Sequence, residues 1–174
     1  MIMKIGVIGP NSLGNTSEAK LKERRNLLSK VAKIISDFKV DIVLTPDKKS
    51  LLDFFGEKCK EFNVKKIWII APMKDGAEKY LNLEVGEIID CEMWHNQPSK
   101  FCEETDIMIC LGYSAGVLSE IGASKYFNPK KILIINEFIS SELPIEINKS
   151  MDIKYLALNE LEDYFKTNFK WDCL

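Results

Sequence analysis

The segment DIMICLGYSAGVLSEIGASKYF, residues 106–127, joins an apolar run to a helical pattern through a turn of small residues. Residues 107–111 are apolar throughout, which is typical of a strand buried on both faces of a sheet. Residues 117–127 are predicted to form a helix, so the segment reads as strand, turn and helix. This order predicts a parallel sheet, because parallel strands need a crossover connection between them.

The same order of apolar run, loop and amphipathic helix recurs on both sides of this segment. The other runs that predict strands span residues 4–8, 41–45, 66–71, 87–92, 132–135 and 153–158. Further helices are predicted over residues 19–38, 48–62 and 160–169. Alternating strands and helices predict a sheet that is covered on both faces. We therefore expect a single α/β domain, residues 1–174, with a mostly parallel sheet of about seven strands and helices on both faces.

The overall charge and hydropathy exclude two classes of partner. The 174 residues include 24 Lys and Arg against 26 Asp and Glu, a net charge of −2. A nucleic-acid binder would need a basic excess to neutralise phosphates, so we expect no nucleic-acid partner. No apolar run reaches the roughly 18 residues of a membrane span, and the N-terminus does not resemble a signal peptide. We therefore expect no membrane partner.

The cysteines and the histidine limit the chemistry that the chain offers. The five cysteines show neither a CxxC pair nor zinc-ligand spacing. Their odd number, without an export signal, favours reduced thiols and a cytoplasmic location. Because His95 is the only histidine, a multi-histidine site is excluded, and we expect no metal.

In an open parallel sheet, ligands bind beyond the C-terminal ends of the strands, where the strand order reverses. The first such loop, residues 9–18, lacks the GxGxxG and P-loop fingerprints. Two interpretations stay open: Gly9, Asn11 and Ser12 hold an anion at a helix N-terminus, or the loop is capped and binds no ligand. Asn15, followed three residues later by Glu18, resembles a capping box and predicts the start of the helix.

The turn at residues 112–117 carries the sharper ligand pattern. Glycines at positions 112 and 116 would let a phosphate approach the backbone, where the first N–H groups of the helix and its dipole would hold the charge. Glu120 lies one turn into the helix, where its carboxylate would accept hydrogen bonds from ribose hydroxyls. The alternative interpretation is a tight turn followed by a surface glutamate. The residues assigned to ligand binding here are Gly112, Tyr113, Ser114, Ala115, Gly116 and Val117.

The stretch DIMICLGYSAGVLSEIGASKYFNPKKILIINEF resembles the strand–PGGxGTxxE–helix–strand signature of LOG-like proteins, long misannotated as lysine decarboxylases. KIGVIGP, VDIVLTPD, VKKIWIIAP and EIIDCEMWHNQPSKFCEETD are similar to the family's preceding segments, so the resemblance covers most of the chain. It implies a Rossmann-like three-layer sandwich, usually assembled as a homodimer. Characterised enzymes of the family are nucleoside-monophosphate phosphoribohydrolases. The wider superfamily includes nucleotide-binding proteins without known activity and molybdenum-cofactor carriers.

The chain departs from the family pattern at three places. The signature has lost its threonine, and TPD at residues 45–47 replaces a triple glycine. The family's Arg-Lys pair has no counterpart in WHNQP, residues 94–98. In the enzymes that arginine and the signature glutamate carry catalysis. The resemblance therefore implies a catalytic role for Glu120 if the chain is an enzyme, with His95 as a partly charged replacement for the arginine.

Together these patterns predict a LOG-like protein that binds a nucleotide or another small phosphorylated ligand. The phosphate would lie at residues 112–117, the ribose near Glu120, and the base near Asn11 and Trp94, where Trp94 either stacks on the base or is simply buried. Two alternatives stay open: a nucleoside 5′-monophosphate phosphoribohydrolase that releases a free base, and a molybdenum-cofactor carrier that binds a pterin phosphate. The missing Arg-Lys pair favours binding over hydrolysis, and no further cofactor is identified.

The resemblance also implies an assembly. The family's dimers pair the helices that follow the signature strand, and this chain offers Ile121, Tyr126 and Phe127 there. Those side chains would either form the dimer contact or face inward in a monomer. We expect a homodimer.

Overall fold

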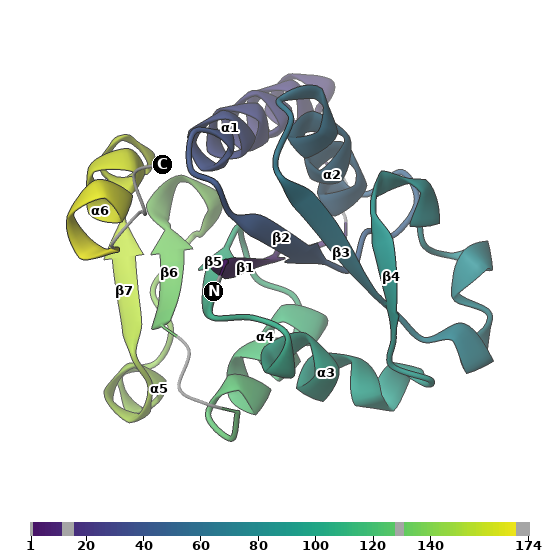
Figure 1. Ribbon diagram of the computed structural model, residues 1–174. Coiled ribbons are helices and arrows are strands. Elements are labelled where there is room, and N and C mark those ends of the chain that lie inside the picture. The colour runs from purple at the N-terminus through teal and green to yellow at the C-terminus, as the bar shows by residue number, and fades with distance from the viewer. Residues whose placement is uncertain (1, 12–15, 128–130, 170–174) are drawn as a thin grey trace.

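The structure, a computed structural model, describes residues 2–11, 16–127 and 131–169. Its centre is one seven-stranded sheet in the order β4-β3-β2-β1-β5-β6-β7, with every neighbouring pair parallel (Figure 1). The predicted α/β class and parallel sheet are therefore confirmed. The strands are β1 (Lys4–Ile8), β2 (Asp41–Leu44), β3 (Lys66–Ala71), β4 (Glu87–Asp90), β5 (Ile107–Cys110), β6 (Lys131–Ile135) and β7 (Ile153–Leu156).

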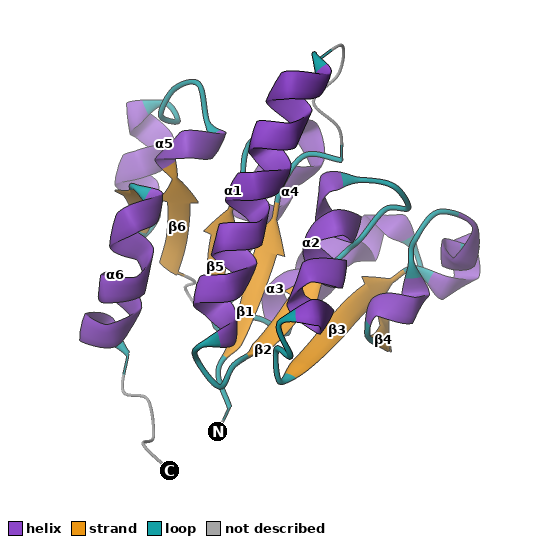
Figure 2. Ribbon diagram, turned by 90° about the horizontal axis from the view of Figure 1, so that it is seen from above, coloured by secondary structure: helices purple, strands orange, loops and turns teal. Residues whose placement is uncertain are grey.

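Helices cover both faces of the sheet, which makes three layers. Figures 1 and 2 show α1, α2 and α6 on one face and α3, α4 and α5 on the other. The helices are α1 (Glu18–Ser36), α2 (Leu51–Glu61), α3 (Gln97–Glu103), α4 (Ala115–Ser124), α5 (Ile145–Ser150) and α6 (Leu161–Asn168). Within the described ranges, six short 3-10 turns, η1 to η6, lie in the connections.

The central strands are apolar throughout because they lie between two hydrophobic cores. Successive side chains of a strand point to opposite faces. On β5, Ile107 and Ile109 therefore join the core under α1, α2 and α6, whereas Met108 and Cys110 join the core against α3 and α4. Neither face of the central strands reaches solvent, so the sequence shows no polar alternation there.

Several element boundaries differ from the prediction by a few residues, and the starts of α1 and α4 matter most for the site. Helix α1 begins at Glu18 with Ser17 as its N-cap, whose hydroxyl accepts a hydrogen bond from Lys20 N at 3.4 Å. The predicted capping role of Asn15 is therefore not needed, and Asn15 itself lies outside the described residues. Helix α4 starts at Ala115 rather than residue 117, because Ser114 already provides its N-cap. The short helix α5 has no predicted counterpart, since six residues carry too little periodicity.

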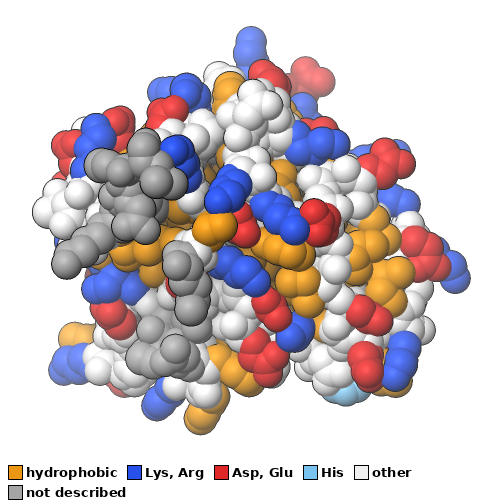
Figure 3. Space-filling view, viewed as in Figure 1, with side chains coloured by type: hydrophobic (Ala, Val, Ile, Leu, Met, Phe, Trp, Pro, Cys, Tyr) orange, Lys and Arg blue, Asp and Glu red, His pale blue; other side chains and the backbone are white. Residues whose placement is uncertain are grey.

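The surface and the thiols add little reactive chemistry. The face in Figure 3 shows basic and acidic side chains interspersed rather than gathered by sign. Four cysteines are buried free thiols, and burial raises the pKa of the Cys110 thiol to about 12. Across the described ranges, no cluster of three or more His, Cys, Asp and Glu is arranged to hold a metal ion. None of the described helices is both long and apolar enough to span a bilayer.

Gly6 lies where β1 and the end of α3 pack tightly against each other. A Cβ at this position would lie 2.5 Å from Thr105 Cγ2 and 2.8 Å from Phe101 Cε1. Phe101 on α3 and Thr105 behind it are fully buried, so neither has room to move aside. The glycine lets α3 settle on β1, and α3 in turn carries part of the candidate site.

We expect Gly6→Ala to lower the free energy of unfolding by roughly 1–3 kcal/mol, the usual cost of an extra methyl group in a packed core. The matched control is Gly122→Ala on α4, where an added Cβ has no neighbour within 4 Å. That variant should be neutral or stabilised by about 0.5–1 kcal/mol, because alanine favours the helix. Urea unfolding measures both. Equal stability of Gly6→Ala and the wild type would contradict the packing argument.

Candidate functional site

A cleft of about 560 Å³ lies where the strand order reverses. The chain runs outward from β1 through β2, β3 and β4 on one side, and through β5, β6 and β7 on the other. Loops that leave β1 and β5 therefore diverge, and this is where ligands bind in open parallel sheets. The cleft is lined by residues after β1 (Gly9, Pro10, Asn11), after β2 (Thr45, Asp47), at the start of α3 (Trp94, Gln97, Pro98) and after β5 (Tyr113, Ser114, Ala115, Gly116, Val117, Ser119, Glu120).

Most of the residues assigned to the site from the sequence line this one cleft. Three do not. Ser12 lies outside the described residues, and His95 is an exposed residue of η4 (Trp94–Asn96) that is not part of the lining. Gly112 is buried behind the turn. The residues that the structure brings together are Gly9, Asn11, Trp94, Tyr113, Ser114, Ala115, Gly116, Val117 and Glu120.

The backbone conformation at position 112 requires a glycine. Its φ is +115°, a conformation that other residues rarely adopt. A Cβ would also lie 3.0 Å from Pro10 Cδ and 3.2 Å from the carbonyl oxygen of Phe138. The glycine therefore closes the gap between the loops after β1 and β6, and close approach of a phosphate is not required to explain it.

The start of α4 presents unused N–H groups to the cleft. Ser114 is the N-cap: its Oγ accepts a hydrogen bond from Val117 N at 3.2 Å, and its carbonyl oxygen accepts one from Leu118 N at 2.9 Å. Within the described residues, the N–H groups of Ala115 and Gly116 have no acceptor, as expected in the first helical turn. Gly116 is exposed, and a Cβ there would meet only Ser114 Oγ, at 3.8 Å. An anion therefore has open access to this end of the helix.

A buried hydrogen-bond chain forms another part of the cleft. Gln97 Nε2 donates to Glu120 Oε1 and to Thr45 Oγ1, both at 2.8 Å. Because both amide hydrogens are used, the side chain of Gln97 is fixed and its own oxygen remains an acceptor. Glu120 is only 8% exposed, and its Oε2 accepts no hydrogen bond from the described part of the chain. Glu120 is thus a buried residue of the cleft, and the interpretation as a surface glutamate is wrong.

Burial sets the protonation of the two acids in the cleft. Burial raises the pKa of Glu120 to about 7, and the nearby charge of Asp47 adds to this, whereas the hydrogen bond from Gln97 opposes it. Burial also raises the pKa of Asp47. The described lining holds no Lys, Arg or His. At neutral pH the Glu120 carboxyl can therefore act either as a hydrogen-bond donor or as an acceptor.

Only part of this polar group can be predicted from the sequence. Thr45 ends the strand predicted over residues 41–45 and Asp47 lies two residues beyond it, which is where polar site residues are expected. Their proximity to α3 and α4 depends on the fold. In the sequence, Gln97 stands out only as a neutral residue in the segment where LOG-like proteins have an Arg-Lys pair. Nothing in its local sequence shows that it would be 7% exposed and tied to Glu120.

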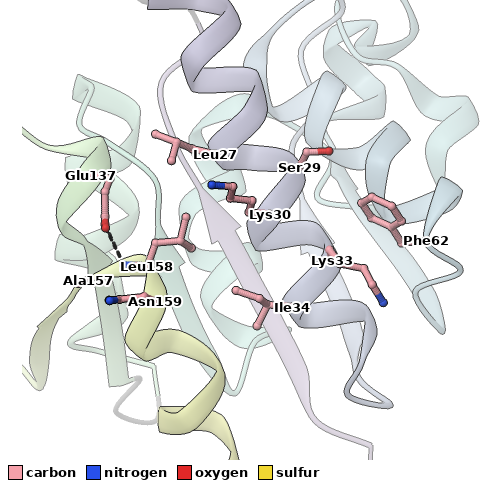
Figure 4. Close-up of a pocket in the computed structure, with 10 residues that line it drawn as sticks. All are labelled: Leu27, Ser29, Lys30, Lys33, Ile34, Phe62, Glu137, Ala157, Leu158 and Asn159. Carbon is pink, nitrogen blue, oxygen red and sulfur yellow. Dashed lines mark hydrogen bonds between the residues drawn. The ribbon is translucent and has the colours of Figure 1, made fainter.

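A larger hollow, of about 740 Å³, lies beside α1 but has a different character. In Figure 4, Leu27, Lys30 and Ile34 project from α1 toward Leu158 of η6 (Leu158–Glu160). The Glu137 carboxylate accepts a hydrogen bond from Leu158 N at 2.9 Å, so it serves the loop structure (Figure 4). Leu158 N begins η6, but its hydrogen is already bonded to Glu137, and the lining of this hollow includes no buried acid. The candidate site is therefore the cleft at the switch point.

The comparisons with known proteins support the fold. No protein-family model matches the chain, and no curated protein matches it in sequence. Fold and site together define a Rossmann-like α/β protein with a cleft at the switch point. Among solved structures, it is similar to the molybdenum cofactor binding protein from Rippkaea orientalis, with a TM-score of 0.70 and 16% identity over 96% of this chain and 97% of that chain.

Two further structures are similar. The Moco carrier protein from Chlamydomonas reinhardtii has a TM-score of 0.74 at 12% identity, over 95% of this chain and 96% of that chain. TM1055, a target of the Northeast Structural Genomics Consortium, has a TM-score of 0.75 at 12% identity, over 95% of this chain and 99% of that chain. At these identities the likeness establishes the Rossmann-like fold that the LOG resemblance implied.

The raised pKa of Glu120 predicts a pH dependence of stability that Glu120→Gln should lack. A folded-state pKa above the unfolded value means that the folded state holds the proton more tightly. This contribution is complete below the unfolded pKa, near 4.5, and is lost as pH rises through about 7. From pH 5 to 8, the wild type should lose roughly 1–3 kcal/mol more unfolding free energy than the variant. Urea unfolding at several pH values measures this, and parallel profiles would refute it.

Proposed function

We propose that the chain binds a small phosphorylated ligand, a nucleotide or a pterin phosphate, with its phosphate at the start of α4. The observation that carries this proposal is the pair of unpaired N–H groups at Ala115 and Gly116, which open onto a cleft at the switch point. The helix dipole favours negative charge at this end, and an exposed glycine leaves room for it. Ser114 and Asn11 add neutral polar groups to the lining.

The acidic part of the cleft fits the remainder of such a ligand. Glu120 Oε2, the amide oxygen of Gln97 and the Asp47 carboxyl are acceptors for hydroxyl or amino hydrogens. Ribose hydroxyls and the amino groups of a purine or pterin all supply such donors. Trp94, which is 39% exposed at the cleft, offers a ring face for the planar base.

A second candidate is a carrier of the molybdenum cofactor. It is favoured by one observation, that several similar solved structures are named as molybdenum-cofactor binding or carrier proteins. Both candidates use the same phosphate position, and they differ in whether the planar part is a nucleobase or a pterin.

Hydrolysis of a nucleoside monophosphate is the remaining alternative. Breaking the ribosidic bond builds positive charge on the sugar, and a carboxylate such as Glu120 would stabilise that charge or activate water. The described lining offers no cation to orient the phosphate, and His95 lies outside it. We therefore propose binding without efficient turnover.

A homodimer also remains a proposal. On the helix expected to pair, Ile121 is only 2% exposed and belongs to the core of a single chain. Phe127 packs partly against the same core, whereas Tyr126, just beyond α4, is 80% exposed and so, of the three residues offered for the contact, is the one open to a second copy.

Gly116→Leu should weaken ligand binding without unfolding the protein. The leucine side chain would occupy the open space in front of the helix N-terminus. We expect adenosine or guanosine monophosphate, or molybdopterin, to raise the Tm of the wild type, because a ligand that binds only the folded state stabilises it. In the variant the dissociation constant should rise at least about 10-fold, a loss of about 1.4 kcal/mol.

Gly122→Leu is the matched control, since that glycine lies on the same helix, in open space, and outside the cleft. It should keep the ligand-induced Tm shift. The proposal fails if no phosphorylated ligand shifts the wild-type Tm at millimolar concentration, or if both variants respond like the wild type.

Release of free base from adenosine or guanosine monophosphate should be slow or absent. Chromatography of reaction mixtures, for the wild type and for Glu120→Gln, measures it. Robust release by the wild type that Glu120→Gln abolishes would make the hydrolase alternative correct. Release that the substitution leaves unchanged would show that the reacting bond lies elsewhere.

A further inference from the structure

A second hollow, of about 600 Å³, adjoins the cleft on its outer side. It shares Asn11, Asp47 and Trp94 with the cleft, so the two form one continuous depression. Its remaining lining residues are Lys48, Lys79 and Tyr80. The lining of the cleft itself has acids and no cation, so the positive side chains that line this depression are those of its outer hollow.

The walls of the outer hollow are held by the backbone. Lys48 N donates to the carbonyl oxygen of Tyr80 at 2.7 Å, and Asp47 forms an isolated antiparallel bridge with Leu81. The loop after β2 is thereby fastened to the segment that follows η2 (Ala77–Lys79). On the other side, Trp94 N donates to Asp75 Oδ2 at 2.7 Å.

The two lysines keep hydrogen-bonding capacity for a ligand. The ion pairs among the described residues use other lysines. Lys48 Nζ donates to the carbonyl oxygen of Glu78 at 2.7 Å, which uses one of its three hydrogens. Lys79 Nζ has no acceptor among the described residues. Both ammonium groups can therefore donate to an anion.

Two aromatic rings stand beside these charges. Tyr80 is 55% exposed and Trp94 is 39% exposed, although large aromatic side chains are mostly buried in folded proteins. An exposed ring next to an unpaired ammonium group suits a ligand that is both planar and negatively charged. The proposed ligand of the inner cleft has a planar ring, which extends toward Trp94.

We infer that the outer hollow is a second anion subsite, where Lys48 and Lys79 bind a second phosphate or carboxylate of the ligand and the rings of Trp94 and Tyr80 contact its planar part. The inference rests on the proposed function, because the first phosphate is assigned to the start of α4. It narrows the ligand class to phosphorylated planar compounds with two separate anionic groups. A simple nucleoside monophosphate would fill only the inner half of the depression.

The test compares ligands that differ by one phosphate. Adenosine and guanosine 5′-monophosphates, their 5′-diphosphates and their 3′,5′-bisphosphates are titrated calorimetrically at about 0.15 M salt, which screens long-range attraction. At least one doubly phosphorylated compound should bind the wild type about 10-fold more tightly than its monophosphate. Comparison of the 5′-diphosphate with the 3′,5′-bisphosphate shows at which position of the ligand the second phosphate has to be attached.

The double variant Lys48→Gln, Lys79→Gln should lose this 10-fold advantage and bind the monophosphate as the wild type does. The control, Lys30→Gln with Lys125→Gln, removes the same charge from exposed lysines outside the depression and should keep the advantage. The subsite is overturned if the Lys48/Lys79 variant still binds the doubly phosphorylated compound more tightly than the monophosphate. It is also overturned if the wild type binds both compounds equally well. Neither result contradicts the proposed function. If no compound binds the wild type, the proposed function fails and the subsite with it.

Discussion

The central strands bury both of their faces, and the architecture follows from that constraint. Ile107 and Ile109 of β5 need one layer of helices, whereas Met108 and Cys110 need another. A chain that must alternate between two layers builds its sheet outward from β1 in two directions. The loops after β1 and β5 then diverge, and the space between them is the cleft. The position of the candidate site is thus a consequence of how the hydrophobic surface is covered.

Within the cleft, the amide of Gln97 ties three elements together. It joins the loop after β2 through Thr45 and helix α4 through Glu120, while sitting itself at the start of α3. The bond favours the ionised form of Glu120, yet burial outweighs it and leaves the pKa raised to about 7. A carboxyl kept in such surroundings lowers the stability of the folded state near neutral pH. Apolar packing would avoid that cost, and acids retained at a cost are typical of functional sites.

The fold could be predicted from the sequence, because the patterns that define strands and helices are periodic and local. Apolar runs such as residues 107–111 and the alternation with helices suffice to define a parallel, doubly covered sheet. The turn before α4 was also recognisable, since small residues between a strand and a helix carry their own signal. Gln97, Thr45 and Asp47 are different, because their proximity depends on how far separate loops extend at one edge of the sheet. Gly112 illustrates the same limit: the sequence shows a glycine in the turn, but its φ of +115° and its closeness to Pro10 belong to the tertiary structure.

Ser114 has two hydrogen-bonding roles that do not compete. Its oxygen accepts the hydrogen of Val117 N and so caps α4, while the hydroxyl hydrogen remains available to an acceptor in the cleft. An arriving anion can take this hydrogen together with the N–H groups of Ala115 and Gly116 and leave the cap intact. The first turn of the helix need not unwind or reorder to receive a ligand. Binding a ligand would therefore cost less conformational entropy than binding by a flexible loop, which must become ordered. A rigid receptor of this kind favours ligands that already have the matching shape.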